Sequence, residues 1–276
     1  METTLTLGVS DLIALVNQTL EYAYPSVVVE GELSSFKLSK GKFVFFDLKD
    51  DQSAVSCFMM SYQLRTPLQD GMKVRVVAVP KLTAWGKFSL TVRDVRPVGE
   101  GDIKKSFKLL HAKLEKEGLF DVSRKRRLPA VPQRVGLIAS AESAGYADFI
   151  KILNARWGGL DVQVADVQVQ GVSASGQIIR AITHFNEQAQ PVEALVIVRG
   201  GGSAEDLAVF NEEPLVRAVA ASRIPTLVGV GHEVDTSLVD LAADLRAATP
   251  SNAAQLLVPD RAALLRDVRG KQHRML

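Results

Sequence analysis

A strand, loop and helix pattern at residues 195–206 carries the first candidate for chemistry. The apolar run Leu195–Val198 predicts a buried parallel strand. After Arg199 comes a glycine run, which lets the backbone approach a ligand closely, and then the start of a predicted helix, where free N–H groups bind anions. The pattern predicts a phosphate site, although a glycine run alone also fits a plain tight turn. The predicted phosphate-binding residues are Ser140, Gly200, Gly201, Gly202 and Ser203.

His232 and Asp235 form a second candidate group, three residues apart after another apolar strand. Histidine transfers protons near neutral pH, and a neighbouring carboxylate can fix its tautomer. Arg199 would then meet the negative charge on a phosphate under attack. Taken singly, each residue also fits a structural role as a helix cap, an ion pair or a surface polar group.

Several carboxylates near these loops admit a Mg²⁺ ion, which prefers oxygen ligands. Their spacing does not demand one, so Mg²⁺ is a possible cofactor and not a required one. The candidate ligands are Asp148, Asp206, Glu233 and Asp235.

Alternating strand and helix patterns over residues 134–252 indicate how these groups are positioned. The alternation predicts an open parallel α/β sheet with Rossmann-like layers. In such sheets ligands bind at the carboxyl ends of the strands. Ser140, Arg199 and His232 each lie at or just past the end of a predicted strand, and Asp148 lies early in the first helix. We expect them to meet at one rim of the sheet.

Residues 1–100 have a different rhythm, with a helical pattern at 9–22 followed by five short β segments up to residue 98. This predicts an N-terminal helix and a small all-β barrel, for which the OB-fold is the commonest five-stranded candidate. Phe45 and Phe46 are interpreted individually as barrel core. Cations and aromatics near the turns are typical of a surface that binds a single nucleic-acid strand. These candidates are Phe36, Lys37, Lys42, Trp85 and Lys87.

A basic segment, 101–133, separates the two predicted domains. From Gly101 to Arg134 the chain has ten cations and four acids. The pattern predicts a helix ended by Gly118 and then a stiff proline-containing linker. A basic helix can be merely a solvated face, but beside an OB-like barrel a polyanion-binding surface is favoured. The candidate DNA-binding residues are Arg124, Lys125, Arg126 and Arg127.

The overall composition of the 276 residues is that of a globular protein, with 47% hydrophobic and 23% charged residues and a net charge of +2. No apolar run is long enough for a membrane span, and no basic-then-apolar signal pattern opens the chain. The single cysteine, Cys57, cannot form an internal disulfide, and no Cys/His zinc spacing occurs. We therefore expect a cytoplasmic protein without a membrane partner.

Residues 253–276 have helical spacing, with Leu257, Leu264, Val268 and Met275 on one face. The pattern stops without a capping signal. It predicts the start of a long C-terminal helix of coiled-coil type.

Several motifs together resemble the large subunit of exodeoxyribonuclease VII, from the first helix to the end of the α/β domain. They are 29–36 (VEGELSSF), 117–121 (EGLFD), 199–207 (RGGGSAEDL), 210–212 (FNE), 229–235 (GVGHEVD) and 243–251 (ADLRAATPS). The resemblance implies an OB domain that binds single-stranded DNA and a catalytic domain that hydrolyses phosphodiester bonds from both ends. It also implies several copies of a small helical subunit on the C-terminal helical region. By motif match, the catalytic group is Asp148, Arg199, His232 and Asp235.

The sequence departs from the family pattern after Ser140, where Ala141-Glu142-Ser143 replaces a Thr-Gly-Ala type of segment. An acidic Glu142 near a phosphate site would weaken substrate binding. The short C-terminal helical region puts small-subunit assembly in doubt. A catalytically silent DNA-binding protein of the same family is therefore the alternative. A Rossmann-type nucleotide enzyme is disfavoured, because the glycine run lacks the G-x-G-x-x-G spacing and follows the third strand.

Overall fold

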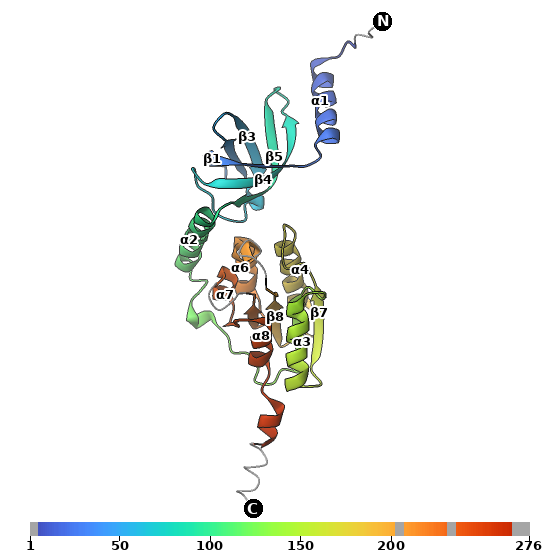
Figure 1. The fold of residues 1–276 in the computed structure, drawn as a ribbon, viewed down its shortest axis with the longest axis vertical. Helices are drawn as coiled ribbons and strands as arrows, with labels where there is room; N and C mark the ends of the chain where they lie inside the picture. The colour runs from blue at the N-terminus through green and yellow to red at the C-terminus, as the bar shows by residue number, and fades with distance from the viewer. Residues whose placement is uncertain (1–4, 202–206, 231–235, 267–276) are drawn as a thin grey trace, which may run out of the picture. The chain divides into compact units, whose positions relative to one another are not determined.

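The computed structural model describes residues 5–201, 207–230 and 236–266. The chain divides into two compact units, Met1–Leu110 and His111–Leu276 (Figure 1). Within the described ranges, no helix is both long and apolar enough to cross a membrane.

The first unit contains a closed five-stranded barrel preceded by helix α1 (Val9–Ala23). The strands close in the order β1-β2-β3-β5-β4, in which only β3 and β5 pair in parallel. This confirms the predicted OB-fold. The strands are β1 (Val27–Ser39), β2 (Phe43–Lys49), β3 (Ala54–Met60), β4 (Lys73–Leu82) and β5 (Phe88–Pro97).

Alternation along β2 decides which side chains fill the barrel. Val44, Phe46 and Leu48 are buried in the core. The residues between them face outward, as the period of two in a strand requires. The core interpretation is therefore confirmed for Phe46 and wrong for Phe45, whose side chain is 45% exposed.

Helix α2 (Glu100–Lys116) follows the barrel and contains the division between the two units. It ends where predicted, at Gly118, which has a φ of +74°. The N–H groups of Gly118 and Leu119 donate to carbonyls of the last helical turn, those of Glu115 and Leu114. Glycine adopts this left-handed conformation without the steric cost of a Cβ atom. The short 3₁₀ turn η2 (Val122–Arg124) follows.

The second unit is built on a parallel five-stranded sheet in the order β10-β9-β8-β6-β7. This confirms the predicted open α/β architecture. The strands are β6 (Arg134–Ala139), β7 (Asp161–Asp166), β8 (Ala194–Val198), β9 (Thr226–Gly229) and β10 (Leu245–Arg246). Strands β6, β8 and β9 are almost wholly buried and apolar, because helices cover both of their faces.

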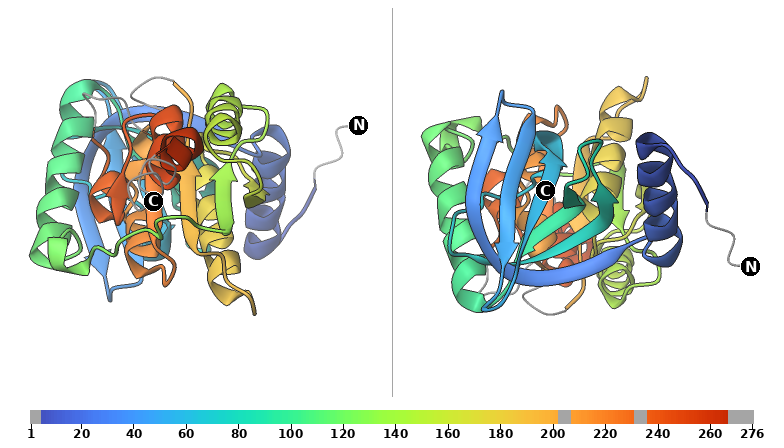
Figure 2. Two further views of the ribbon diagram at one scale, coloured as in Figure 1. Left: turned by 90° about the horizontal axis from the view of Figure 1, so that it is seen from below. Right: turned by 90° about the horizontal axis from the view of Figure 1, so that it is seen from above.

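Helices flank the sheet in two groups. On one face α3 packs against α8, and on the other α4 packs against α6, which lies next to α7. Figure 2 shows this layering from the end of the sheet. The helices are α3 (Ala144–Arg156), α4 (Ala174–Glu187), η3 (Ala208–Asn211), α6 (Glu213–Ala221), α7 (Leu238–Ala242) and α8 (Pro250–Leu257).

The predicted single helix from residue 253 is interrupted. Helix α8 ends at Leu257, and a new helical turn begins at 261, with a break between them. Pro259 disfavours helical geometry at the preceding Val258, and Asp260 caps the next turn by accepting from the Ala263 N–H. The prediction of one continuous helix is therefore wrong within the part that the structure describes.

Candidate functional site

Strands β6 and β8 are neighbours, yet the chain visits β7 between them. The two strands therefore form a topological switch point, and open α/β sheets bind ligands at the carboxyl ends of such a pair. Ser140 directly follows β6, and Arg199 directly follows β8. The Arg199 N–H donates to the Gly229 carbonyl at 3.3 Å, which ties this point to the end of β9. The structure thus brings Ser140 and Arg199 to one rim, at the place where open α/β sheets bind ligands.

Arg199 is a buried cation, with only 2% of the residue exposed. A guanidinium cannot shed its proton when it is buried, so its charge acts in a region of low dielectric. Arg199 directly follows β8, at the rim. This suits a group that meets a charged phosphate.

Gly145, in the first turn of α3, lies directly against Gly200. A Cβ atom on Gly145 would lie 2.5 Å from the Gly200 nitrogen and 2.8 Å from its Cα. Only glycine allows this approach of two backbones. The contact holds the start of α3 against the glycine run. The role of Gly145 was not predicted from the sequence, because a glycine near a helix start gives no signal until its neighbour in the fold is known.

The loop before α3 is fixed by short hydrogen bonds. Ser143 is the N-cap, accepting from the Tyr146 N–H at 3.2 Å, and its hydroxyl donates to the Ser140 carbonyl at 2.7 Å. The Ala141 N–H donates to an Asp166 carboxylate oxygen at 2.9 Å. The departure from the family pattern therefore still forms an ordered helix start. The start of α3 adds a partial positive charge at the rim.

Asp148 lies one turn after Gly145 and is exposed. Within residues 5–201, 207–230 and 236–266 it makes no hydrogen bond or ion pair, and Glu142 is likewise exposed. Asp148 is thus available to a ligand or a metal ion. Its catalytic role stays a prediction.

The remaining predicted rim residues lie outside the described residues: Gly202, Ser203, Asp206, His232, Glu233 and Asp235. Gly201 is described and exposed. Among the residues that are described, no group of three His, Cys, Asp or Glu side chains could hold a metal ion. Asp148 is the one metal-ligand candidate placed by the structure, and Mg²⁺ binding stays a prediction.

A buried carboxylate lies in helix α7. Asp240 is 2% exposed and accepts from both the backbone N–H and the hydroxyl of Ser237, at 2.9 and 2.8 Å. Burial raises the pKa of Asp240 above its usual value. The Leu238 N–H donates to the Asn211 side chain at 2.8 Å. These bonds anchor the start of α7, and nothing in the sequence analysis identified them.

The outer face of the barrel has an aromatic row that the sequence analysis missed. Strand register places Lys37 beside Phe45 and Phe45 beside Phe58, across β1, β2 and β3. The ring centroids of Phe45 and Phe58 are 5.3 Å apart, and Phe43 lies 6.0 Å from Phe58. The ring pairs are tilted, at 44° and 32°. A cation beside such a cluster of rings offers both a phosphate contact and a surface on which bases can stack.

Other predicted barrel residues divide by exposure. Trp85 is 96% exposed in the turn between β4 and β5, and Lys37, Lys42 and Lys87 are exposed. Phe36 instead packs against the barrel core. Trp85 therefore fits the predicted stacking role better than Phe36 does.

The basic segment after α2 also divides into two kinds of residue. The Arg126 guanidinium pairs with both carboxylate oxygens of Asp244, at 3.1 and 2.7 Å, and donates to the Ile224 carbonyl. Burial would raise the pKa of Asp244, but hydrogen bonds from Arg126 and Thr226 outweigh it and lower that pKa. Arg126 thus has a structural partner. Arg124 and Arg127 are exposed and Lys125 is half-buried.

Comparison with known proteins agrees with this arrangement. The family model for the exonuclease VII large subunit matches residues 119–276, and a model for an OB-fold nucleic acid binding domain matches residues 7–96. A solved structure of replication protein A bound to single-stranded DNA matches a third of the chain at 15% identity, with a TM-score of 0.25, and supports no argument.

Three relatives named exodeoxyribonuclease 7 large subunit match nearly the whole chain. The protein from Syntrophotalea carbinolica is 42% identical over 95% of this chain and 66% of its own length. Those from Hahella chejuensis and Ralstonia nicotianae are 41% and 40% identical, over 92% and 96% of this chain and 58% and 61% of their own. The chain spans about three fifths to two thirds of the length of these relatives. With a matching family model over more than half of its residues, the chain belongs to the exonuclease VII large-subunit family.

Proposed function

We propose that this protein hydrolyses phosphodiester bonds of single-stranded DNA from the strand ends, as the large subunit of a two-component exonuclease. The observation that carries the proposal is the rim at the β6–β8 switch point. There a buried Arg199 follows one strand, and the start of α3 meets the glycine run through Gly145 and Gly200. Backbone N–H groups of a helix start and of a glycine run, together with a cation, are the groups that bind phosphate, and this supports the proposal.

The residue roles follow from chemistry at that rim. Arg199 stabilises the charge on the scissile phosphate, and His232 acts as general acid or base. Asp235 orients the imidazole, and Asp148 positions the substrate or holds a metal ion. Backbone N–H groups of the glycine run bind phosphate oxygens; the predicted residues are Ser140, Gly200, Gly201, Gly202 and Ser203.

The barrel binds the DNA strand. Bases stack on Phe45, Phe58 and Trp85, and Lys37 contacts the backbone phosphates. Stacking tolerates any base, because every base has a π face. The barrel therefore binds single strands with little sequence preference, which suits an enzyme that shortens arbitrary DNA.

Mg²⁺ and the small subunit complete the proposal. Asp148, Asp206, Glu233 and Asp235 supply oxygen ligands for Mg²⁺, which would polarise the phosphate or activate water. Several small subunits would dock on the C-terminal helical region. The place of action is the cytoplasm, where single-stranded DNA arises.

End-labelled single-stranded DNA tests the proposal. The purified chain is incubated with and without the small subunit, in Mg²⁺ and in chelator. Release of labelled products supports the nuclease, and the chelator lanes decide the metal requirement. Tight binding without cleavage in every lane contradicts the nuclease. That outcome favours a silent DNA-binding protein, for which the exposed Glu142 beside the rim is the observation in support.

A further inference from the structure

Asn211 links two segments that leave neighbouring strands of the parallel sheet. It is the last residue of η3, which follows β8 and the glycine run along the chain. Its side-chain Oδ1 accepts from the N–H of Leu238 at 2.8 Å. Leu238 is the first residue of α7, which follows β9 and the 231–235 loop. One hydrogen bond therefore joins the two segments on which the proposed function places Arg199 and His232.

The backbone on which Asn211 sits is held by the core. Its neighbours in η3, Val209 and Phe210, are fully buried. The Glu212 N–H donates to the Val209 carbonyl at 3.2 Å, which closes the turn. Asn211 itself is half-buried. Its side chain therefore extends from a turn that the core keeps in place.

The other hydrogen bonds at the start of α7 stay within the helix. The Ser237 N–H and hydroxyl both donate to Asp240, and the Asp240 N–H donates back to the Ser237 hydroxyl. This reciprocal cap connects α7 to no other element. Leu238 and Val239 are buried, but apolar packing has no preferred direction, whereas a hydrogen bond does. Among the hydrogen bonds that the start of α7 makes to described residues, the one to Asn211 is the one that reaches another element.

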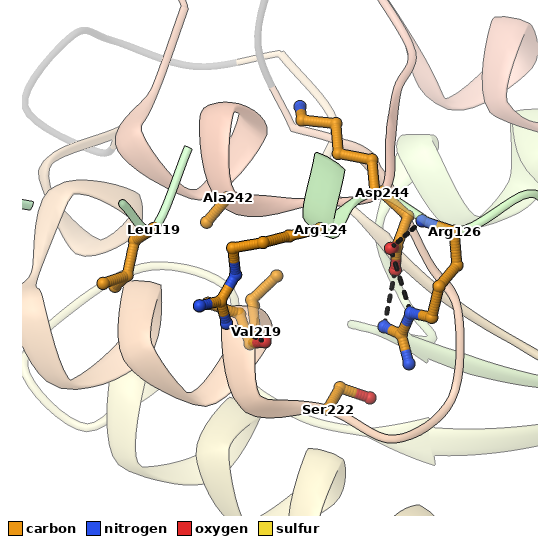
Figure 3. Close-up of a pocket in the computed structure, with 9 residues that line it drawn as sticks. Leu119, Arg124, Arg126, Val219, Ser222, Ala242 and Asp244 are labelled. Atoms are coloured by element: carbon orange, nitrogen blue, oxygen red, sulfur yellow. Dashed lines mark hydrogen bonds and ion pairs between the residues drawn. The ribbon is translucent and has the colours of Figure 1, made fainter. Parts of the chain in front are cut away.

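The far end of α7 is fixed independently of Asn211. Asp244 lies just past the helix, and its carboxylate pairs with the Arg126 guanidinium (Figure 3). The same carboxylate accepts from the N–H of Thr226, the first residue of β9, at 2.7 Å. This end of α7 is therefore attached at the amino ends of the strands. The bond to Asn211 fixes the other end, where the chain arrives from the 231–235 loop.

The proposed mechanism needs the two segments in a fixed relation. It places Arg199 on the scissile phosphate and uses His232 for proton transfer, and these residues belong to different segments. A displacement of about 1 Å between reacting groups can cost about a hundredfold in rate. We propose that Asn211 is a positioning residue, which through Leu238 holds the segment carrying His232 and Asp235 against the segment carrying Arg199. The inference rests on the proposed nuclease function.

Single-turnover cleavage of end-labelled single-stranded DNA, with the small subunit and Mg²⁺ present, tests the role of Asn211. Asn211→Leu keeps the size of the side chain and removes the acceptor, so the maximal rate should fall by roughly ten- to a hundredfold. The half-saturating enzyme concentration should equal that of the parent, because the barrel is unchanged. An unchanged maximal rate would overturn the inference, whether or not the half-saturating concentration rises. If Asn211→Leu does not fold, Asn211→Ala removes the same acceptor and should lower the maximal rate likewise.

Asn211→Asp separates positioning from a general loss of stability. Its carboxylate keeps an acceptor for the Leu238 N–H, and a negative charge suits the start of a helix. The maximal rate of this variant should therefore stay within a few-fold of the parent rate. A rate as low as that of Asn211→Leu would show that the bond to Leu238 is not the cause, and the inference would fail.

Asn186 offers a matched control at the amino ends of the strands. It is also half-buried, and its Oδ1 accepts from the Arg223 N–H, shortly before β9, at 2.7 Å. Its amide also donates to the Ile182 carbonyl, so Asn186→Leu should lower the melting temperature at least as much as Asn211→Leu. Assayed below both melting transitions, Asn186→Leu should keep the maximal rate of the parent. Equal losses of rate in the two variants would assign the effect to stability and overturn the inference.

The parent protein distinguishes failure of the inference from failure of the proposed function. If the parent cleaves and Asn211→Leu cleaves equally well, the inference fails and the proposed function stands. If the parent releases no product, the proposed function is contradicted, and the inference falls with it.

Discussion

The barrel and the parallel sheet offer their functional groups in opposite ways. On the barrel, Lys37, Phe45 and Phe58 lie in a row on an outer face, and Trp85 is almost fully exposed. At the sheet, Arg199 is buried and the Gly145–Gly200 contact leaves no room for a Cβ atom. The first arrangement is a surface, and the second is a point where backbones converge.

The two regions should therefore respond differently to substitution. A surface of several side chains divides the binding free energy among them, so losing one weakens binding without abolishing it. At the rim, a close contact between two backbones and one buried cation have separate roles. No neighbouring group can replace either of them, so losing one should abolish most of the activity. Single substitutions on the barrel should therefore lower the affinity for single-stranded DNA in small steps. A single substitution at the rim should lower the cleavage rate by orders of magnitude.

The largest effect is expected for His232→Ala. General acid–base catalysis contributes about 10²- to 10⁴-fold, so the cleavage rate should fall by about that factor. Binding of single-stranded DNA should be unchanged, because the barrel is intact. Rates on end-labelled DNA and fluorescence anisotropy measure the two properties. A variant that still cleaves would remove His232 from the proposed mechanism.

Asp244→Asn should destabilise the sheet unit by about 2–3 kcal/mol, because it leaves Arg126 without its paired charge. Thermal melting monitored by circular dichroism checks this. As a control, Asp51→Asn changes an exposed carboxylate of the barrel and should leave the melting unchanged. Equal melting of the two variants would show that the ion pair contributes nothing.

The same pair predicts a response to acid. The pKa of Asp244 is lowered in the folded state, so its contribution to stability is complete above the unfolded pKa of about 3.9. It is lost as the pH falls through the lower, folded pKa. Urea unfolding between pH 6 and pH 2 should show a smaller pH dependence in Asp244→Asn than in the parent. Identical profiles would contradict the assignment.

Phe45→Ala should weaken binding of single-stranded DNA by about 1–3 kcal/mol, the loss of one base stack. The matched control Phe43→Ala removes a less exposed ring from the edge of the same cluster and should cost less. Anisotropy titrations at fixed salt compare the two. If Phe43→Ala costs more than Phe45→Ala, the row does not run along Lys37, Phe45 and Phe58.

The smallest effect concerns the end of α2. Gly118→Ala should cost about 1 kcal/mol of stability, because φ is +74° there. Gly101→Ala lies inside the same helix with free space around it and should instead stabilise by a fraction of that amount. Melting temperatures that move in the same direction would contradict this account of the helix end.

Much of the fold could be predicted from the sequence, because the spacing of apolar residues and the positions of turn residues are local signals. The barrel strands and the strand–helix alternation both follow from them. All four residues of the run Phe43-Val44-Phe45-Phe46 are apolar, so the sequence does not show which alternate residues face the barrel core. For this reason the outward orientation of Phe45 was not predicted. Pro259 is itself a local signal for the break in the C-terminal helix. The prediction gave more weight to the helical spacing of the apolar residues around it.

The site was harder to predict, since it depends on contacts between distant segments. Arg126 and Asp244 are 118 residues apart, and Gly145 meets Gly200 only because α3 packs at the switch point. Ser140 and Arg199 were predicted from the rule on strand ends, which needs no side-chain geometry. The ion pair and the backbone contact could be identified only from the three-dimensional structure.

The central claim is that the barrel binds DNA and the rim of the sheet cleaves it. Single-turnover cleavage at rising enzyme concentration tests this separation. For Phe45→Ala, we expect the maximal rate at saturating enzyme to equal that of the parent and only the half-saturating concentration to rise. For His232→Ala, we expect an unchanged half-saturating concentration and a maximal rate lower by about 10²- to 10⁴-fold. A low maximal rate of Phe45→Ala at saturation would show that the barrel residue acts in cleavage as well as in binding.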